Sequence, residues 1–315
     1  MRKFYARRAL RIFPLYYATL LVYIVYVAAL RRHSPGGIAF FHDLPHFATY
    51  TFNWLPPGRL PPSPDPFCFA WSLATEEQFY LLWPPLLVAT LTIGSWKRTW
   101  PPLVVLAVLI AISEGVRCGW VGDSWIMPWR IPASLSLPIL LGAAAALVTS
   151  TRLGFAVVSA VVGRVWSAPV AAVLLVVAIA TNAKPQITAI LMVVLVVATC
   201  IVEWTPLHPI LRWRPLAFIG VISYGVYMLH DLCADAVSIA TREQRGILVF
   251  AVTLVTVVVV AYLSFRFFET PVLKLKRRYE TSGEHDGDEL SRIAALSRPE
   301  VPQPEVPQAV CDKGA

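Results

Sequence analysis

Ile247-Leu-Val-Phe-Ala-Val-Thr-Leu-Val-Thr-Val-Val-Val-Val-Ala-Tyr-Leu-Ser-Phe265 is a continuous segment without a single charged side chain. A helix needs roughly 20 mostly apolar residues to cross the hydrocarbon core of a bilayer. This segment meets that requirement. It therefore predicts a membrane-spanning helix, and the rest of the chain can be tested against the same rule.

The composition agrees with a membrane protein. Of the 315 residues, 57% are hydrophobic and 15% are charged, whereas soluble domains are about 45–50% apolar and about 25% charged. These values exclude a water-soluble enzyme, a disordered chain and a small disulfide-rich secreted protein. The net charge of +8 is interpreted as a topology signal, with no nucleic-acid partner. Five scattered cysteines lack metal-ligand spacing, so no metal site is expected.

Apolar segments recur along the whole chain. They predict an all-α fold, a polytopic membrane helix bundle with about eight transmembrane helices. The predicted spans lie near residues 12–30, 77–93, 101–116, 133–149, 168–183, 186–203, 217–236 and 247–265. Residues 153–162 are apolar but too short to cross, which favours an interfacial or re-entrant helix. With both termini cytoplasmic, the inner loops hold roughly twice as many Lys and Arg residues as the outer loops.

The chain divides into two parts. Residues 1–279 are predicted to form the membrane domain, in which 31–75 is the one large outer loop, stiffened by prolines between Pro56 and Pro66. Residues 280–315 are polar and contain the sequence Pro-Glu-Val-Pro-Gln twice in tandem. This composition predicts a disordered cytoplasmic tail.

Three arginines precede the first predicted span. Arg7, Arg8 and Arg11 share one face if this segment is helical. Two guanidinium groups on one face can grip a phosphate or diphosphate. The alternative is an anchor that sets topology and binds lipid headgroups, and both interpretations stay open.

Two adjacent carboxylates, Glu76 and Glu77, lie at the start of the second predicted span. Thr75 with Gln78 fits a capping box, which would place both glutamates in the first turn of a helix. Glu76 and Tyr80 share a helical face, so a carboxylate can instead point into the bundle. A plain helix start and a functional carboxylate pair are both consistent with this spacing.

A polar stripe crosses the predicted span 217–236. Ser223, Tyr227 and His230 lie at positions i, i+4 and i+7 of this segment. Ionisable groups at membrane depth are costly and suggest function, although a lone histidine at a membrane interface is often structural. A neighbouring stripe holds Tyr224, Asp231 and Asp235.

A last group of charges is predicted at the outer surface. Glu114, Arg117 and Arg130 are either solvated loop charges or partners of Glu76 and Glu77 across the outer mouth of the bundle. On the inner side, the segment Phe268–Pro271 ends the last span, where it can either cap the helix or pair with the inner arginines.

Taken in order, these motifs resemble the bacterial acyltransferase 3 family of integral membrane O-acyltransferases. The resemblance covers roughly residues 4–275, and its most specific part is the second of the motifs. The motifs are Phe4-Tyr-Ala-Arg-Arg-Ala-Leu-Arg-Ile-Phe-Pro14, Trp71-Ser-Leu-Ala-Thr-Glu-Glu-Gln-Phe-Tyr-Leu-Leu-Trp-Pro84, Ser223-Tyr-Gly-Val-Tyr-Met-Leu-His230 and Glu269-Thr-Pro271.

The resemblance implies a membrane enzyme that moves an acyl group, commonly acetyl, from acyl-CoA to a hydroxyl group. The acceptor would be a glycan, a lipid-linked sugar or a glycosylated secondary metabolite. Acyl-CoA would be a co-substrate, with no permanently bound cofactor, and Arg8 and Arg11 would hold its CoA end. The predicted substrate-binding residues are Tyr80, Arg130, Ser223, Tyr224 and Tyr227.

The chain departs from the family pattern at its start. Family members carry two further spans before the arginine motif, and the first of these holds the histidine viewed as catalytic. The chain is therefore expected to be N-terminally incomplete and to have little activity as written. His230, the one histidine placed inside a predicted span, becomes the candidate base, with Glu76 and Glu77 as further catalytic candidates. A transporter or flippase and a non-catalytic membrane partner protein are the alternatives.

Overall fold

The computed structural model describes residues 2–55, 66–93, 99–118, 135–202, 204–242 and 246–276. Within these ranges the regular structure is entirely helical, which confirms the predicted fold class. The helices are α1 (Arg2–Tyr26, extended by a π-helical turn over Val27–Arg31), α2 (Pro35–Ala48), α3 (Trp71–Ile93), α4 (Trp100–Arg117), α6 (Leu137–Thr149), α7 (Arg152–Val162), α8 (Ser167–Ala180), α9 (Pro185–Ile201), α10 (His208–Leu211), α11 (Arg214–Thr241), α12 (Ile247–Ser264, followed by a π-helical turn over Phe265–Glu269) and α13 (Thr270–Lys276).

Four described helices are long and apolar enough to cross a membrane. They are Arg2–Arg31, Trp100–Arg117, Arg214–Thr241 and Ile247–Leu275. Helices α6 and α7 form a fifth candidate only if this pair, bent by 114°, counts as one span. Helices α8 and α9, with 14 and 17 residues, are shorter than predicted. A count of eight spans is therefore not confirmed, while the separate helix predicted near 153–162 is present as α7.

The outer surfaces of the helices are apolar. Phe250 on α12 is 67% exposed, and Val255 and Val173 are also exposed. The buried positions of α8, in contrast, are alanines. Large apolar side chains on the outside and small ones between helices are the pattern of a bundle whose surroundings are lipid.

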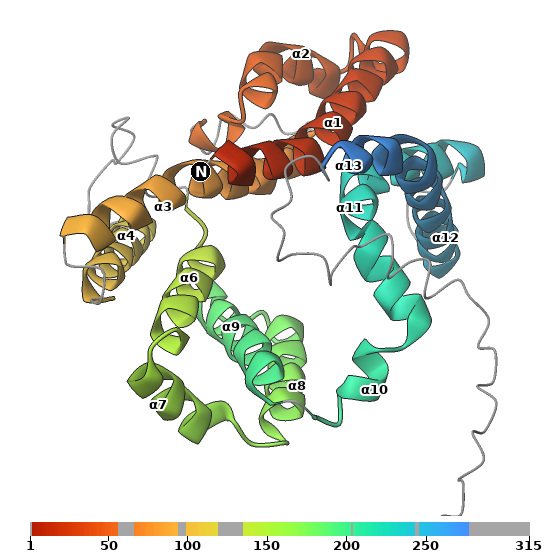
Figure 1. The fold of residues 1–315 in the computed structure, drawn as a ribbon. Coiled ribbons are helices and arrows are strands. Elements are labelled where there is room, and N and C mark those ends of the chain that lie inside the picture. The colour runs from red at the N-terminus through yellow and green to blue at the C-terminus, as the bar shows by residue number, and fades with distance from the viewer. Residues whose placement is uncertain are drawn as a thin grey trace, which may run out of the picture.

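Helices α1, α11 and α12 lie together (Figure 1). Tyr224 on α11 donates to the carbonyl of Ile12 (2.9 Å), and Tyr26 donates to Asp235 (3.2 Å), so α1 and α11 run in the same direction. Helix α12 returns antiparallel: Phe218, early in α11, lies beside Tyr262 near the end of α12 (ring centroids 5.7 Å), whereas Cys233, later in α11, shares a buried cluster with the earlier Val257. The start of α1 and the end of α13 are therefore on the same side of this group of helices.

Helix α3 runs against the N-terminal half of α1. Tyr5 donates to the carbonyl of Leu81 (3.0 Å), and Arg8 lies 2.8 Å from Glu77. The apolar part of α3 therefore extends past the start of α1. The predicted placement of Glu77 at the outer mouth, opposite the side of Arg8, is wrong, because the two side chains are in contact at the same end of α1.

The segment predicted as the outer loop 31–75 contains a helix. Helix α2 begins after Ser34, whose hydroxyl accepts from the backbone N–H of Gly37 (3.1 Å) as an N-cap. The sequence analysis assigned this segment to the outer side and did not identify the helix over 35–48. Phe40 and Phe47 of α2 are buried with Tyr16 and Tyr23 of α1. The proline-rich stretch 56–65 and the predicted tail lie outside the described residues.

Candidate functional site

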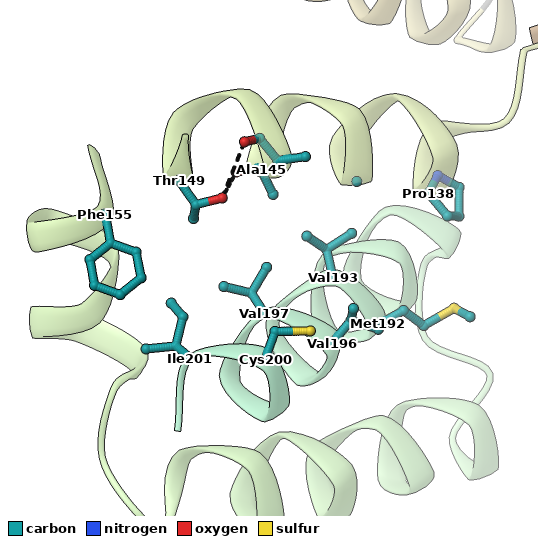
Figure 2. A pocket seen from close by; sticks show the side chains of 12 residues that line it. Pro138, Ala145, Thr149, Phe155, Met192, Val193, Val196, Val197, Cys200 and Ile201 are labelled. Carbon is teal, nitrogen blue, oxygen red and sulfur yellow. Dashed lines mark hydrogen bonds between the residues drawn. The ribbon is translucent and has the colours of Figure 1, made fainter. Parts of the chain in front are cut away.

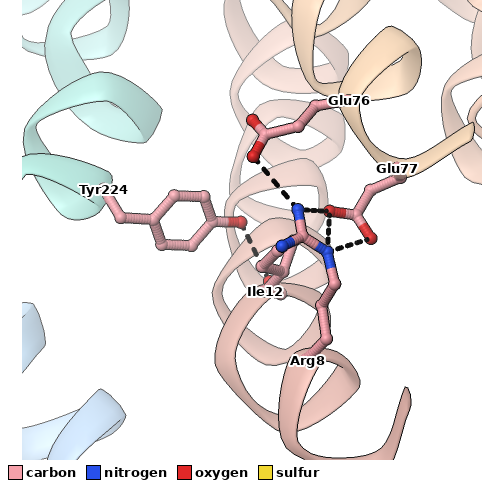
Figure 3. Close-up of polar contacts among 5 residues, drawn as sticks. All are labelled: Arg8, Ile12, Glu76, Glu77 and Tyr224. Atoms are coloured by element: carbon pink, nitrogen blue, oxygen red, sulfur yellow. Dashed lines mark hydrogen bonds and ion pairs between the residues drawn. The ribbon is translucent and has the colours of Figure 1, made fainter. Parts of the chain in front are cut away.

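Arg8 joins two carboxylates and an aromatic ring (Figure 3). Its Nη2 lies 2.8 Å from Glu77 Oε1 and 3.0 Å from Glu76 Oε1, and its Nε lies 3.2 Å from Glu77 Oε1. The Arg8 Cζ atom sits 3.1 Å from the centroid of the Tyr80 ring. Glu76, Glu77 and Tyr80 share one face of α3, so the prediction that a carboxylate points into the bundle is the one that agrees with the structure. We refer to these four residues as the Arg8 cluster.

The Arg8 cluster is partly buried and carries excess negative charge. The side chains of Arg8 and Glu77 are 18% and 12% exposed, whereas that of Glu76 is 41% exposed. Burial raises the pKa of the Glu77 carboxyl, and the hydrogen bonds and charge of Arg8 oppose this rise. One guanidinium faces two carboxylates, so a phosphate bound at Arg8 would have to compete with both.

Tyr224, on α11, lies near the Arg8 cluster. Its ring points toward α1, and its hydroxyl donates to the carbonyl of Ile12, one turn along α1 from Arg8 (Figure 3). Ile12 precedes Pro14 on α1, within the helix. Glu269 lies close to the neighbouring residue, since a Cβ at Gly225 would be only 3.3 Å from Glu269 Oε1. A glycine at 225 thus leaves room for a carboxylate next to Tyr224.

Gln78 has a structural role that the sequence interpretation missed. Helix α3 begins at Trp71, so the predicted capping box of Thr75 and Gln78 is wrong, and the glutamates are not in the first turn. The Thr75 hydroxyl donates to the carbonyl of Trp71 (3.1 Å). Gln78 Nε2 donates to Tyr50 O (2.7 Å) and Asn53 Oδ1 (2.9 Å), and its Oε1 accepts from Asn53 Nδ2 (2.9 Å) and Trp54 Nε1 (3.1 Å). The amide therefore fastens the segment 50–54 to α3.

Tyr50 occupies an unusual backbone position. The N–H of Thr51 donates to His46 O (2.9 Å) and that of Tyr50 to Phe47 O (3.3 Å), which is the Schellman pattern at the end of α2. This pattern places Tyr50 at φ 55°, where glycine is usual. A non-glycine residue in this region costs about 1–3 kcal/mol. The Tyr50 ring stacks on Tyr16 with a centroid distance of 4.2 Å.

A second polar group lies further along α11, around Tyr227. The Tyr227 hydroxyl contacts the Ser72 hydroxyl and donates to the carbonyl of Phe69 (2.8 Å). Ser72 is one turn before Glu76 on α3, so Tyr227 connects the polar stripe of α11 to the helix that carries the Arg8 cluster. This contact joins two of the predicted motifs.

His230 follows one turn after Tyr227. Its Nδ1 lies 2.6 Å from the carbonyl of Tyr227, and its Nε2 lies 3.4 Å from Asp231 Oδ1. A carbonyl can only accept, so Nδ1 carries the proton. In the neutral ring this leaves the Nε2 lone pair to accept a proton, which is the geometry that a general base requires. The ring also packs edge-on against Phe69.

The remaining predicted site residues are Ser223, Arg11, Arg117 and Arg130. Ser223 is exposed on α11, and Arg11 is exposed on α1. Arg117 pairs with Glu114 (3.4 Å), which also accepts from Gln186 (2.7 Å). The predicted pairing of these outer charges with Glu76 and Glu77 is therefore wrong for Arg117. Arg130 lies outside the described residues.

Asp235 forms a third polar contact near the end of α1. It accepts from Tyr26 (3.2 Å) and pairs with Arg31 (3.3 Å). The sequence placed Asp235 on a polar stripe without identifying either partner, because α1 and α11 are far apart in the chain. No group of three or more His, Cys, Asp or Glu side chains suited to a metal ion is found in the described part of the chain.

A separate groove of about 510 Å³ lies between α6, α7 and α9 (Figure 2). Its lining is almost entirely apolar, with Phe155, Met192 and Val197 among the side chains. The one hydroxyl, that of Thr149, donates to the carbonyl of Ala145 in its own helix (2.8 Å). The lining suits hydrocarbon and offers no polar partner to a sugar.

The described structure is thus a helical membrane protein whose polar side chains converge between α1, α3 and α11. The sequence profile of a family described as "Acyltransferase domain" matches residues 1–266. The chain belongs to this acyltransferase 3 family.

Two relatives have curated names. The chain is 26% identical to the peptidoglycan O-acetyltransferase OatA of Listeria monocytogenes serovar 1/2a (strain ATCC BAA-679 / EGD-e), over 87% of this chain and 46% of that protein. It is 27% identical to YrhL of Bacillus subtilis (strain 168), provisionally named a peptidoglycan O-acetyltransferase, over 86% of this chain and 45% of that protein. The chain spans about half the length of these relatives. No solved structure matches.

Proposed function

We propose that the protein is a membrane O-acetyltransferase that modifies a hydroxyl group of a cell-envelope glycan. The observation that carries this proposal is that three family motifs meet at one polar region. Arg8 of α1 pairs with Glu77 of α3, and Tyr224 of α11 donates to a carbonyl of α1 (Figure 3). The family match and the names of the two relatives support O-acetyl transfer to peptidoglycan. Peptidoglycan is accordingly the acceptor to test first.

We further propose acetyl-CoA as the donor. A base takes the proton of the acceptor hydroxyl while its oxygen attacks the thioester carbonyl. The tetrahedral intermediate then collapses, the carbon–sulfur bond breaks, and the CoA thiolate takes up a proton. The products are an O-acetyl ester and free CoA, so no oxidant or further reactant is required.

The proposed roles follow from the geometry of each side chain. His230 is the proposed base, because its Nε2 is the nitrogen left to accept a proton. The residues proposed to surround the substrate are Glu76, Glu77, Tyr80, Tyr224 and Tyr227, together with Ser223 and Arg130. For the CoA phosphates we favour Arg11 over Arg8, because the Arg11 side chain is exposed, whereas that of Arg8 is only 18% exposed.

The proposed topology has both termini in the cytoplasm and residues 1–279 in one membrane domain, with 280–315 as its tail. The start of α1 and the end of α13 share one side, and basic residues are concentrated there, among them Arg7, Arg214 and Arg266. Such clustering is typical of cytoplasmic loops. Acetyl-CoA would then enter from this side.

The direct test uses the purified chain in lipid nanodiscs. It is incubated with acetyl-labelled acetyl-CoA and a peptidoglycan disaccharide-peptide, and O-acetyl ester is measured together with CoA release. Formation of labelled ester that mild base removes supports the proposal. Hydrolysis of acetyl-CoA without ester, or no turnover with this donor and acceptor, contradicts it.

A further inference from the structure

The hydroxyl of Tyr50 is buried without a hydrogen-bond partner among the described residues. Tyr50 as a whole is only 8% exposed. Leaving a buried donor unpaired is unfavourable, and native proteins rarely do so without a functional or solvent partner. The backbone at Tyr50 is also in the left-handed region. The position of Tyr50 is therefore unfavourable in two respects, its left-handed backbone and its unpaired buried hydroxyl.

Three contacts place Tyr50 beside the Arg8 cluster. Arg8, Ile12 and Tyr16 are spaced four residues apart on α1 and share one face. Tyr224 reaches the carbonyl of Ile12, and the Tyr50 ring stacks on Tyr16 at 4.2 Å. From α3, Gln78, which adjoins Glu77 in sequence, holds the carbonyl of Tyr50 at 2.7 Å. Tyr50 is thus fixed from both helices that carry the Arg8 cluster.

The electrostatic surroundings keep this hydroxyl neutral. Burial raises the pKa of Tyr50, and the nearby Tyr224, Tyr16, Tyr17 and Glu77 raise it further through their charges. A neutral phenol is a hydrogen-bond donor. Because Glu76 and Glu77 both face the Arg8 guanidinium, the space next to these two carboxylates favours an uncharged group over a phosphate.

We propose that the Tyr50 hydroxyl donates a hydrogen bond to an uncharged oxygen of the substrate at the Arg8 cluster. That oxygen is either a hydroxyl of the acceptor sugar or the acyl carbonyl of the donor. Tyr50 is then a substrate-positioning residue. This inference rests on the proposed acetyl transfer and adds a residue that lies outside the motifs of the family resemblance.

Access to the hydroxyl requires a side chain to move. The Phe13 ring lies 5.6 Å from the Tyr50 ring and is itself 38% exposed. Tyr17, 42% exposed, is also a neighbour of the Tyr50 ring, but its hydroxyl is bound to Ala48 O (3.0 Å). A change of the Phe13 rotamer breaks no hydrogen bond and is therefore the smallest movement that uncovers the ring. Phe13→Ala is therefore expected to increase access without removing any hydrogen bond.

The first test compares Tyr50→Phe with Tyr16→Phe in the full chain. Tyr50→Phe removes only the unpaired hydroxyl, so the melting temperature should stay the same or rise, while kcat/KM should fall at least about threefold, the value of one lost neutral hydrogen bond. Tyr16→Phe removes a buried hydroxyl that donates to Phe47 O (2.8 Å). It should lower the melting temperature and leave kcat/KM of the folded protein within about twofold. Unchanged kcat/KM in Tyr50→Phe would overturn the inference.

The second test does not depend on turnover. The chain is prepared with 3-fluorotyrosine at position 50, and separately at position 17, whose hydroxyl bonds to Ala48 O. The ¹⁹F resonance is followed while acetyl-CoA or the peptidoglycan disaccharide-peptide is added, in the parent and in Phe13→Ala. A shift at position 50 alone supports the inference, and the ligand that causes it identifies the source of the oxygen. No shift with either ligand overturns it, even if the protein is active; an inactive protein with this shift would contradict only the proposed function.

Discussion

Arg8 and Glu77 join α1 to α3 through two nitrogen donors of one guanidinium, with Nη2 2.8 Å and Nε 3.2 Å from Glu77 Oε1. The same guanidinium lies over the Tyr80 ring. A planar fork that pairs with a carboxylate and stacks on an aromatic ring is a property of arginine that lysine does not share. The interaction holds in place the segment of α3 that contains Glu76, Gln78 and Tyr80.

Breaking this ion pair is expected to destabilise the protein. Arg8→Ala leaves the Glu77 carboxylate, 12% exposed, without its cation, and removing one partner of a buried pair costs about 3–5 kcal/mol. Arg8→Lys should fall between the parent and Arg8→Ala. The measurement is thermal unfolding in nanodiscs. Arg31→Ala, which breaks the more exposed pair with Asp235, is the control and should cost less than about 1 kcal/mol; equal losses would contradict the argument.

Gln78→Met is expected to loosen the segment 50–54. The substitution keeps the length of the side chain but removes the hydrogen bonds to Tyr50, Asn53 and Trp54. An unpaired buried polar group costs about 1–3 kcal/mol, and Asn53 and Tyr50 both lose partners. Hydrogen exchange over residues 50–54 should become faster. The matched variant Gln186→Met removes one bond, to Glu114, and should leave exchange at 50–54 unchanged.

Periodicity and apolar length predicted much of the fold because both are local properties. They identified the helices α1, α4, α11 and α12 and the short α7. They did not predict the Schellman turn at the end of α2, because the residue with the left-handed backbone there is Tyr50 and not a glycine. They also failed for Gln78, because a capping box and a buried amide network use the same residues, and only the positions of Asn53 and Trp54 distinguish them.

The sequence was sufficient to identify the candidate residues of the site, but not to predict which of them contact each other. The arginines, the carboxylates and the stripe on α11 were each found from spacing, but spacing within one helix does not say which helix lies opposite. The outer position assigned to Glu77 depended on treating 77–93 as a span beside 12–30. In the structure α3 instead passes the start of α1, with Leu81 beside Tyr5.

The topology predicts opposite labelling at two points on the chain. A reporter fused after Lys276 should read cytoplasmic, and one inserted between Arg32 and His33 should read external, because α1 separates the Arg8 end from the Arg31 end. The insertion precedes Ser34, so the N-cap of α2 is kept. A reporter at the end of α11, after Arg242, is the internal control and should read external, since Asp235 lies beside Arg31. Different readouts at 32 and 242 would contradict the shared direction of α1 and α11.

Replacing His230 is expected to separate chemistry from folding. His230→Ala removes the nitrogen proposed to accept the acceptor proton, and loss of a positioned base lowers kcat by about 10²–10⁴-fold. His230→Asn places an amide N–H where Nδ1 was, so it can still donate to the carbonyl of Tyr227 but cannot act as a base. It should retain the parent melting temperature and show the same loss of kcat. Full activity in a folded His230→Asn protein would exclude His230 as the base and direct the search to Glu76 and Glu77, each tested as the glutamine variant against the same assay.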